Sequence, residues 1–416
     1  MSSPRDIEAR RLIREGYIAY QSASLGVHTV TFQPKGEVDA NEDRIVTDIW
    51  NLHGQHWLLL AVFDGHIGSA AVQYTSQAFP AAIRTGLQEF IENIVGPLDR
   101  SNITAHQAQV TKIIQKAIMK FDNDLGDAVR ELCPRPEELT EEQARCLIEE
   151  HREILERAFH GTTMAFTLIN VDQRFMWAAG VGDSTVGLSY MGRDGLPKAR
   201  RLCTMHTFKN PKQYFMANMA HPSSEQPLFD WEDRLLGWQT IARAIGNYSM
   251  KFPAPYLANL FRYLPGFEDA PFDDIIPRIK TPPYIVNGPS VCFTDLAHFW
   301  PRQSKIFLFS DGVDNLVDGW LVFKPREHSG GDPVDVVSAL LADHIEPRIE
   351  GILGHPVVPR WSGEEDNLAI DVLGNLLGGT DIERLEAVTD LERLNKPGWP
   401  FHIDDTSIIV WPVTDL

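Results

Sequence analysis

The chain has 416 residues, 43% of them hydrophobic, and carries a formal net charge of -19 with a pI near 5.1. That much apolar sequence is enough for a large core. An acidic surface of this kind disfavours nucleic acid and anionic membranes, so we expect neither as a partner.

The cysteines indicate no metal or disulfide framework. Cys133, Cys146, Cys203 and Cys292 are widely scattered and form no C-x-x-C pair, which is typical of reduced thiols in an intracellular protein. No apolar run reaches the length of a membrane-spanning helix, so we expect no membrane insertion. The N-terminus lacks the apolar core of a signal peptide and contains acidic residues that a mitochondrial presequence would avoid.

The first part of the chain is predicted to contain two helical stretches with strands between them. Residues 1–27 are expected to form an N-terminal extension with one short helix. A helical pattern over 68–92 contains Pro80, which should kink or divide it. Between these two segments we expect strands at 28–32, 44–50 and 57–63.

Two helices and a strand meander are predicted next. Over 104–132 apolar residues recur at every third and fourth position, as on the buried face of a helix. The acidic stretch 137–159 is interpreted as an added helix whose charged side is solvated. From 162 to 188, three short apolar segments separated by polar pairs predict a meander of strands.

The second half is less regular. Residues 208–289 contain many prolines, and so long a weakly patterned segment inside a domain usually indicates a functional flap or an insertion. Helices are expected at 332–351, 367–377 and 381–391. Because motifs occur at both ends of the chain, we expect one domain over 28–416 with inserted segments near 131–159, 208–289 and 318–400.

Three aspartates lie next to strongly apolar runs. Asp64 and Asp311 each follow such a run, and Asp404 comes just before one. An Asp-Gly pair alone is more often a turn, and we interpret Asp194-Gly195 as one. Continuous apolar runs before Asp64 and Asp311 instead indicate buried strands that bring a carboxylate to the rim of a sheet. Carboxylates gathered in this way suit hard divalent cations, so the pattern predicts a metal-dependent hydrolase.

The sequence around these aspartates contains six short motifs in a fixed order. They are Asn41–Arg44, Phe63–Gly68, Gly161–Ala165, Gly180–Ser184, Phe309–Val313 and Asp404–Val410. Together they resemble the metal-dependent serine/threonine protein phosphatases of the protein phosphatase 2C family, over about residues 36–412. Phe121–Leu125 and Asp366–Gly379 are similar to the branch that contains mitochondrial pyruvate dehydrogenase phosphatase.

The resemblance implies an α/β sandwich with two central antiparallel β-sheets flanked by α-helices. It implies two Mn²⁺ or Mg²⁺ ions, with a third that is weaker in the family, and direct attack of a metal-bridging water or hydroxide on phosphoserine or phosphothreonine. The partner would then be a phosphoprotein substrate. The resemblance leaves the oligomeric state undecided, and the compartment as either cytoplasmic or mitochondrial.

By the same resemblance, a defined set of residues should hold the ions. Asp64 is expected to bridge two of them, with the Gly65 carbonyl completing one coordination shell. The other metal residues are Asp311 and Asp404 for the first ion, Glu42 for the second and Asp183 for the third.

Three further assignments concern neighbours of these ligands. Glu42 and Asp43 are adjacent and would face opposite sides of a strand, so we assign Glu42 as the ligand and Asp43 as its support. A solvated acidic turn is the alternative for this pair. His66 matches the family's general acid, which protonates the leaving oxygen. A buried, hydrogen-bonded structural histidine is the alternative there.

Several positions depart from the family pattern. They are Val38 in place of a phosphate-binding arginine, Asn247 and Asn315 in place of aspartates, and Thr185 in place of an arginine. Lys35 or Arg44 could replace the arginine missing at Val38, although a plain surface role is the usual one for such a lysine.

These departures support a second hypothesis, a catalytically silent phosphatase-like domain that binds a partner. The intact metal residues favour the enzyme, because charged residues are not retained together once the ions that hold them are lost. A hydrolase of small phosphate esters is a third hypothesis, which differs only in the shape of the cleft.

Overall fold

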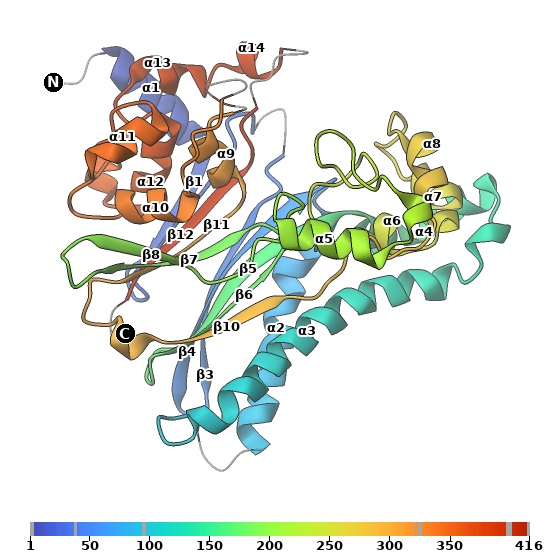
Figure 1. Cartoon of the computed structure of the whole chain (residues 1–416), viewed down its shortest axis with the longest axis horizontal. Coiled ribbons are helices and arrows are strands. Elements are labelled where there is room, and N and C mark those ends of the chain that lie inside the picture. Colours follow the sequence, from blue (N-terminus) through green and yellow to red (C-terminus); the bar gives the residue numbers. More distant parts are fainter. Residues whose placement is uncertain are drawn as a thin grey trace.

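In the computed structural model, the chain forms two β-sheets packed face to face with helices on both outer sides (Figure 1). The structure describes residues 4–36, 40–93, 97–320, 322, 327–396 and 402–413. The strand orders are β1-β2-β12-β11-β7-β8 in the first sheet and β10-β6-β5-β4-β3 in the second, where β9 also pairs with β5. Neighbouring strands run antiparallel. The predicted sandwich of two antiparallel sheets between helices is therefore confirmed.

The strands of the first sheet are β1 (Tyr17–Ser22), β2 (Val27–Phe32), β7 (Thr185–Met191), β8 (Pro197–Arg201), β11 (Lys305–Phe309) and β12 (Thr406–Pro412). Those of the second are β3 (Arg44–Leu52), β4 (Gln55–His66), β5 (Gly161–Asn170), β6 (Phe175–Val181), β9 (Ile245–Gly246) and β10 (Ser290–Asp295). The strands predicted between residues 28 and 63 correspond to β2, β3 and β4. Asp194-Gly195 forms the turn between β7 and β8, as expected, with Gly195 at a φ of 75°.

Helices cover the outer face of each sheet. Beside the second sheet lie α2 (Ala70–Asn93), α3 (Ile103–Leu132) and α4 (Glu141–Phe159). On the first sheet side lie α1 (Pro4–Glu15), α9 (Gly312–Asp318), α10 (Pro333–Leu340), α11 (Pro347–Leu353), α12 (Leu368–Leu377), α13 (Ile382–Ala387) and α14 (Leu391–Leu394). The short helices α5 (Pro211–Ala220), α6 (Tyr248–Lys251), α7 (Ala254–Asn259) and α8 (Phe272–Ile275) belong to the segment 208–289.

The side chains of β4 alternate between two apolar layers. Leu58, Leu60 and Val62 pack in the layer between the sheets, whereas Leu59 and Phe63 face the helices. This follows from the period of two along a strand, which here is buried on both faces. The alternation also decides where the polar end of β4 points, because the position two residues after Val62 faces the opposite sheet.

Several helix predictions need correction. Helix α2 is not divided at Pro80, because a continuous apolar face that includes Phe79 and Ile83 packs on both sides of the proline. The helix expected at 332–351 is two helices, and Pro347 begins the second, where a missing N–H costs little. The helix expected at 381–391 is also divided, since Asp390 caps the new helix α14 by accepting from the Arg393 amide.

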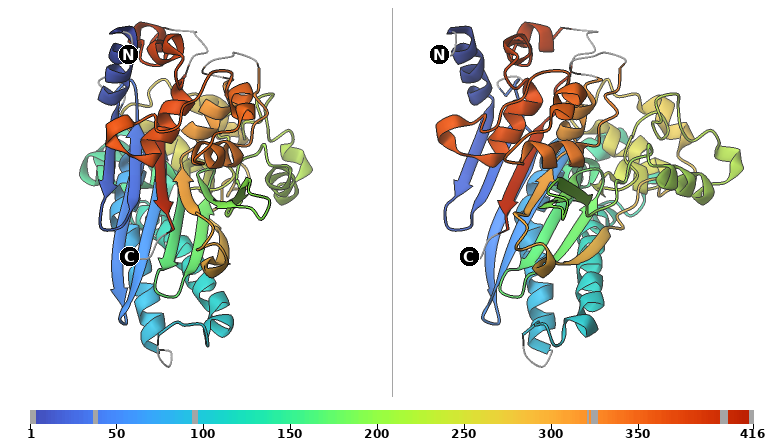
Figure 2. Two further views of the ribbon diagram at one scale, coloured as in Figure 1. Left: turned by 90° about the vertical axis from the view of Figure 1, so that its left-hand side faces the viewer. Right: turned by 60° about the vertical axis from the view of Figure 1, so that its left-hand side comes forward.

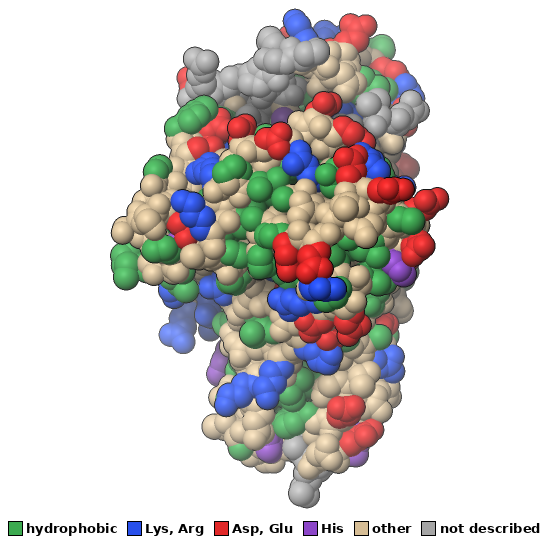
Figure 3. Space-filling model, turned by 90° about the vertical axis from the view of Figure 1, so that its right-hand side faces the viewer, with side chains coloured by type: hydrophobic (Ala, Val, Ile, Leu, Met, Phe, Trp, Pro, Cys, Tyr) green, Lys and Arg blue, Asp and Glu red, His purple; other side chains and the backbone are tan. Residues whose placement is uncertain are grey.

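The segment 208–289, here called the flap segment, projects beyond the sheets (Figure 2) but is joined to the second sheet through β9, which pairs with β5. Its hydrogen bonds are mostly local, and its regular elements are short. Figure 3 faces this end of the molecule and shows exposed hydrophobic side chains close to acidic ones. Trp231 is 88% exposed and Phe215 is 64% exposed. The division of the chain into an N-terminal extension and one domain with three insertions stays a prediction, but residues 17–22 of that extension are β1, which pairs with β2.

Candidate metal centre

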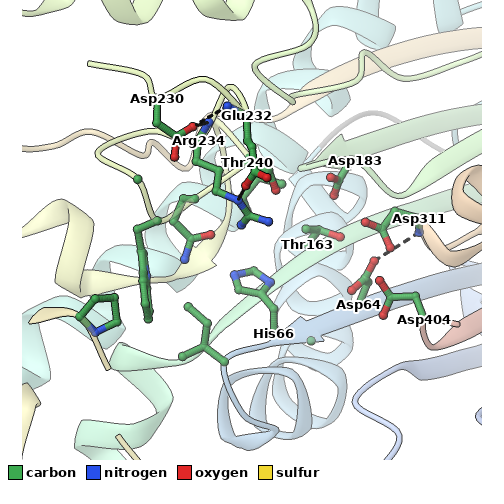
Figure 4. Close-up of a pocket in the computed structure, with 17 residues that line it drawn as sticks. Asp64, His66, Thr163, Asp183, Asp230, Glu232, Arg234, Thr240, Asp311 and Asp404 are labelled. Atoms are coloured by element: carbon green, nitrogen blue, oxygen red, sulfur yellow. Dashed lines mark hydrogen bonds and ion pairs between the residues drawn. The ribbon is translucent and has the colours of Figure 1, made fainter. Parts of the chain in front are cut away.

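Four carboxylates reach one pocket from the ends of strands in both sheets. Asp64 lies near the end of β4, and Asp183 lies in the turn between β6 and β7. Asp311 directly precedes α9, just after β11, and Asp404 comes two residues before β12. All four line a pocket of about 630 Å³ (Figure 4). The expectation that strand ends would bring Asp64, Asp311 and Asp404 together therefore agrees with their positions.

The carboxylates lie close enough to share cations. Asp64, Asp183 and Asp311 each offer an oxygen, and these oxygens lie within 4.8 Å of one another. The Asp311 backbone amide donates to Asp64 Oδ2 at 3.3 Å. Asn315 donates from Nδ2 to Asp404 Oδ2 at 3.4 Å. Clustered oxygen ligands of this type suit Mg²⁺ or Mn²⁺.

The electrostatics of the cluster also favour cations. Burial raises the pKa of Asp64 well above its ordinary value, and the nearby Asp311 raises it further. Burial and the charge of Asp404 do the same to the pKa of Asp311, and burial raises that of Asp183 to about 6. Like charges held this close repel one another unless they are protonated or a cation lies between them. The residues therefore fit a group of divalent cations.

Glu42 and Asp43 lie beside this cluster and point to different partners. Glu42 Oε2 accepts from the Gly68 amide at 3.3 Å, and Glu42 is absent from the described lining of the pocket. Asp43 is buried and accepts from Ser310 Oγ at 2.7 Å. Its Oδ1 has no hydrogen-bond partner among the described residues, and burial raises its pKa to about 8. The two side chains diverge, although they lie in the loop before β3 and not on a strand as expected.

Asp405, a residue that was not predicted as part of the site, connects Glu42 and Gln33 by hydrogen bonds. Its Oδ2 accepts from the Glu42 backbone amide at 2.6 Å, and its Oδ1 accepts from Gln33 Nε2 at 2.6 Å. These bonds tie the loop before β3 to the start of β12. The double aspartate Asp404-Asp405 was the only sequence signal for it. Gly65 also matters here, because a Cβ at this position would lie 2.8 Å from the Glu42 carbonyl oxygen and 2.7 Å from Val72.

His66 lies in the same pocket and is paired with Asn247. The distance between His66 Nε2 and Asn247 Oδ1 is 2.8 Å. Burial lowers the pKa of His66 to about 4, so the free protein holds a neutral imidazole there. Asn247 is buried at a φ of 53°, a conformation that asparagine adopts more readily than most residues. The hydrogen bond to Asn247 raises the pKa of His66, but burial lowers it by more.

The flap segment supplies the other wall of the pocket. Its lining residues there are Asp230, Glu232, Arg234, Gly237, Trp238, Gln239, Thr240, Ile241 and Pro271. The sequence indicated that this segment is a flap or an insertion, but its irregular pattern gave no sign of which side chains would face the carboxylates.

Of the positions that depart from the family pattern, Val38 lies outside the described residues. Thr185 is buried in β7 and accepts a hydrogen bond from Arg201 Nη1. Asn315 lies against Asp404, as described above, and the neighbouring Asp314 is half-buried, with one inaccessible carboxylate oxygen that has no described partner. Burial raises the pKa of Asp314 to about 7.

Comparisons with known proteins agree with this architecture. No protein-family model matches the chain. The human mitochondrial "[Pyruvate dehydrogenase [acetyl-transferring]]-phosphatase 1" is 28% identical over 162 residues, which are 38% of this chain and 29% of that protein. The human phosphatase 2 of the same name is 21% identical over 291 residues, 62% of this chain and 54% of that protein. The chain thus spans about a third to a half of the length of these relatives.

A solved structure extends the likeness to nearly the whole chain. The serine-threonine phosphatase 2C from Toxoplasma gondii matches with a TM-score of 0.52 at 11% identity, covering 95% of this chain and 98% of that one. So low an identity shows the fold alone. In fold the chain is protein phosphatase 2C-like, and over part of its sequence it is similar to the pyruvate dehydrogenase phosphatases.

Proposed function

We propose that this chain is a metal-dependent protein phosphatase that hydrolyses phosphoserine and phosphothreonine in proteins. One observation carries the proposal: Asp64, Asp183 and Asp311 hold oxygens within 4.8 Å of one another at the floor of an open pocket. Similarity to phosphatases supports the reaction class.

The metal assignments follow the same residues. Asp64, Asp311 and Asp404, with the Gly65 carbonyl, would hold two ions, and Asp183 would contribute to a third. Mn²⁺ or Mg²⁺ bound there would neutralise phosphoryl charge and supply a water of lowered pKa as the nucleophile. Glu42 stands one step back from the pocket, which supports contact through a water, as hard cations often make. Asp43, which accepts a hydrogen bond from Ser310 Oγ, would help to orient these metal residues.

His66 is proposed as the group that protonates the leaving oxygen of the substrate. Its position in the pocket beside the carboxylates supports this role. A phosphate dianion that enters the pocket would offset the cost of burying a charged imidazole, and so raise the pKa of His66 towards the working pH. Asn247 would keep the ring in place through its bond to Nε2.

The substrate is proposed to be a phosphoprotein in an intracellular setting. The four cysteines are free, which agrees with a reducing compartment. Among the described residues, no helix is both long and apolar enough to cross a membrane. The mitochondrial location printed for the two human relatives makes that compartment one of the two candidates, beside the cytoplasm.

The proposal is tested by following phosphate release from three peptides that differ only in phosphothreonine, phosphoserine or phosphotyrosine. We expect Mn²⁺-supported release from the first two and much slower release from the third. Equal rates on the phosphotyrosine peptide would contradict the Ser/Thr assignment. No release from any peptide by a folded protein that binds Mn²⁺ would favour the silent binding domain.

A further inference from the structure

We propose that Arg234, in the flap segment, binds the phosphate group of the substrate. This inference rests on the proposed phosphatase function and adds a substrate contact to it. The family arginine that contacts phosphate is replaced in this sequence by Val38. Arg234 would supply a positive charge from the wall of the pocket that the flap segment forms.

The side chains that line the pocket are mostly negative, so a phosphate dianion needs positive groups in order to bind there. The described lining includes the carboxylates of Asp64, Asp183, Asp230, Glu232, Asp311 and Asp404. Among the lining residues that the structure describes, Arg234 alone is a lysine or arginine. Cations held by the aspartates can neutralise one side of a phosphate dianion, and a guanidinium on the other side would neutralise the rest.

The geometry directs Arg234 towards the site. Figure 4 shows its guanidinium extending from the flap segment into the pocket, on the side of His66. The backbone below it is fixed, because Asp230 Oδ1 accepts from the amides of both Glu232 and Arg234 at 2.9 Å. The next residue, Leu235, is buried and its amide donates to the Gln239 carbonyl at 2.7 Å. The arginine therefore stands on an anchored turn.

The side chain is also available to a ligand. Its Nε donates to Glu232 Oε2 at 3.1 Å, and both side chains are 45% exposed. An exposed pair of this kind contributes little stability and is easily exchanged for another anion. The Nη groups of a guanidinium can then donate hydrogen bonds to two phosphate oxygens at once, a geometry that lysine lacks.

Other cations near the site have different positions. Arg44 donates to Gln73 Oε1 at 2.8 Å and to the Asn41 carbonyl at 2.8 Å. It lines a separate groove beside β1 and β2. Lys35 is not among the described residues that line the pocket. Neither position matches the replacement role considered for these two residues from the sequence.

The test compares Arg234→Gln with wild type and with the control Arg262→Gln. Arg262 lies in the same flap segment but pairs with Asp273 at 3.0 Å, away from the lining. Titration calorimetry on Mn²⁺-loaded protein would measure binding of inorganic phosphate, and kinetics on a phosphothreonine peptide would give KM and kcat. We expect Arg234→Gln to weaken phosphate binding and raise KM about tenfold each, with Mn²⁺ affinity unchanged and Arg262→Gln like wild type.

A second variant, Glu232→Gln, should change the phosphate affinity in the opposite direction. It removes the charged partner of Arg234, so phosphate should bind more tightly than to wild type. In the double variant with Arg234→Gln most of that gain should vanish, because it acts through the arginine.

The outcomes separate the two proposals. Unchanged phosphate affinity and KM in Arg234→Gln would overturn the role of Arg234, and so would a loss of Mn²⁺ affinity in the same variant, which would indicate a structural role. A wild type that binds phosphate through Arg234 but releases none from peptides would overturn the proposed catalysis and leave the binding role intact.

Discussion

The Asp311 backbone amide donates a hydrogen bond of 3.3 Å to Asp64 Oδ2, although Asp64 lies near the end of β4 in the second sheet and Asp311 follows β11 in the first. Inward-facing side chains of β4, from the second sheet, and of β11, from the first, pack in the same apolar layer between the sheets. The sandwich therefore brings together two carboxylates that are 247 positions apart. Burial and the charge of Asp311 raise the pKa of Asp64, and burial and the charge of Asp404 raise the pKa of Asp311. This repulsion within the cluster is the reason that we expect cations there.

Asp311→Asn should abolish turnover and yet stabilise the metal-free protein. The substitution removes one negative charge from the cluster, so repulsion falls when no cation is present, while metal affinity falls as well. Thermal unfolding in chelator should show a higher Tm than wild type, and Mn²⁺ should raise that Tm much less. Asp233→Asn, an exposed change in the flap segment, is the matched control and should behave as wild type. A Mn²⁺ response of wild-type size in Asp311→Asn would count against the assignment.

The stabilisation by Mn²⁺ should grow as pH rises from 5 to 8. The folded, metal-free protein holds protons on Asp183, with a pKa of about 6, and on Asp43, with a pKa of about 8, at pH values where the unfolded chain has lost them. The stability that these two groups contribute is therefore fully present below the ordinary carboxyl pKa of about 4. It is lost as pH rises through their pKa values in the folded protein. Mn²⁺ competes with those protons, so its benefit is greatest at high pH.

Tm measured in chelator and in Mn²⁺ across this range checks the relationship. Buried histidines outside the pocket affect both series alike, and the difference between the two series cancels their contribution. A difference that is constant or shrinks towards pH 8 would contradict the predicted sign.

Asp122→Ala should unfold the protein more easily by about 3–5 kcal/mol, the typical cost of leaving one partner of a buried ion pair alone. Asp122 accepts from Lys251 Nζ at 2.8 Å and from the Gly246 amide at 2.8 Å, and both side chains of the pair are nearly fully buried. Gly246 directly precedes Asn247, so the same network holds the partner of His66. Urea unfolding provides the measurement.

Asp124→Ala offers a control on the same helix. Asp124 pairs with Lys120 at 2.6 Å, but these side chains are 58% and 75% exposed. The expected cost is below about 0.5 kcal/mol. Equal losses in the two variants would show that the Asp122 pair has no special structural importance.

His66→Gln should lower kcat for a phosphothreonine peptide by about 10²- to 10⁴-fold if His66 protonates the leaving oxygen. The loss should be much smaller for 4-nitrophenyl phosphate, because its leaving group is a stable anion that needs no proton. Glutamine can still donate to Asn247, so the pocket should stay in place, and Mn²⁺ affinity serves as the check. Equal losses on both substrates would assign His66 a structural role instead.

The sequence was most informative where a side chain is tied to a strand end. Asp64, Asp311 and Asp404 could be found because an apolar strand adjoins each of them, and residues 57–63 and 305–309 are such strands. Strand β1 could not be found, since its edge position leaves Ile18 and Tyr20 exposed and erases the apolar alternation of a buried strand.

The roles of Asn247 and Arg234 depend on contacts that no local pattern encodes. Asn247 meets His66 because Gly161, in between, has no side chain: a Cβ there would collide with both. Arg234 faces the carboxylates only through the fold of an irregular turn, which hydrophobic periodicity does not describe. Long-range contacts of this kind require the structure.

Catalysis by metal ions at the aspartate cluster is tested by measuring phosphate release from a phosphothreonine peptide with Mn²⁺, after excess chelator, and after Mn²⁺ is restored, with Asp64→Asn as the blank. We predict release with Mn²⁺, loss on chelation and recovery on restoration, with none above background in Asp64→Asn. Release that persists in chelator, or that Asp64→Asn retains, would contradict a reaction that depends on metal ions at this cluster.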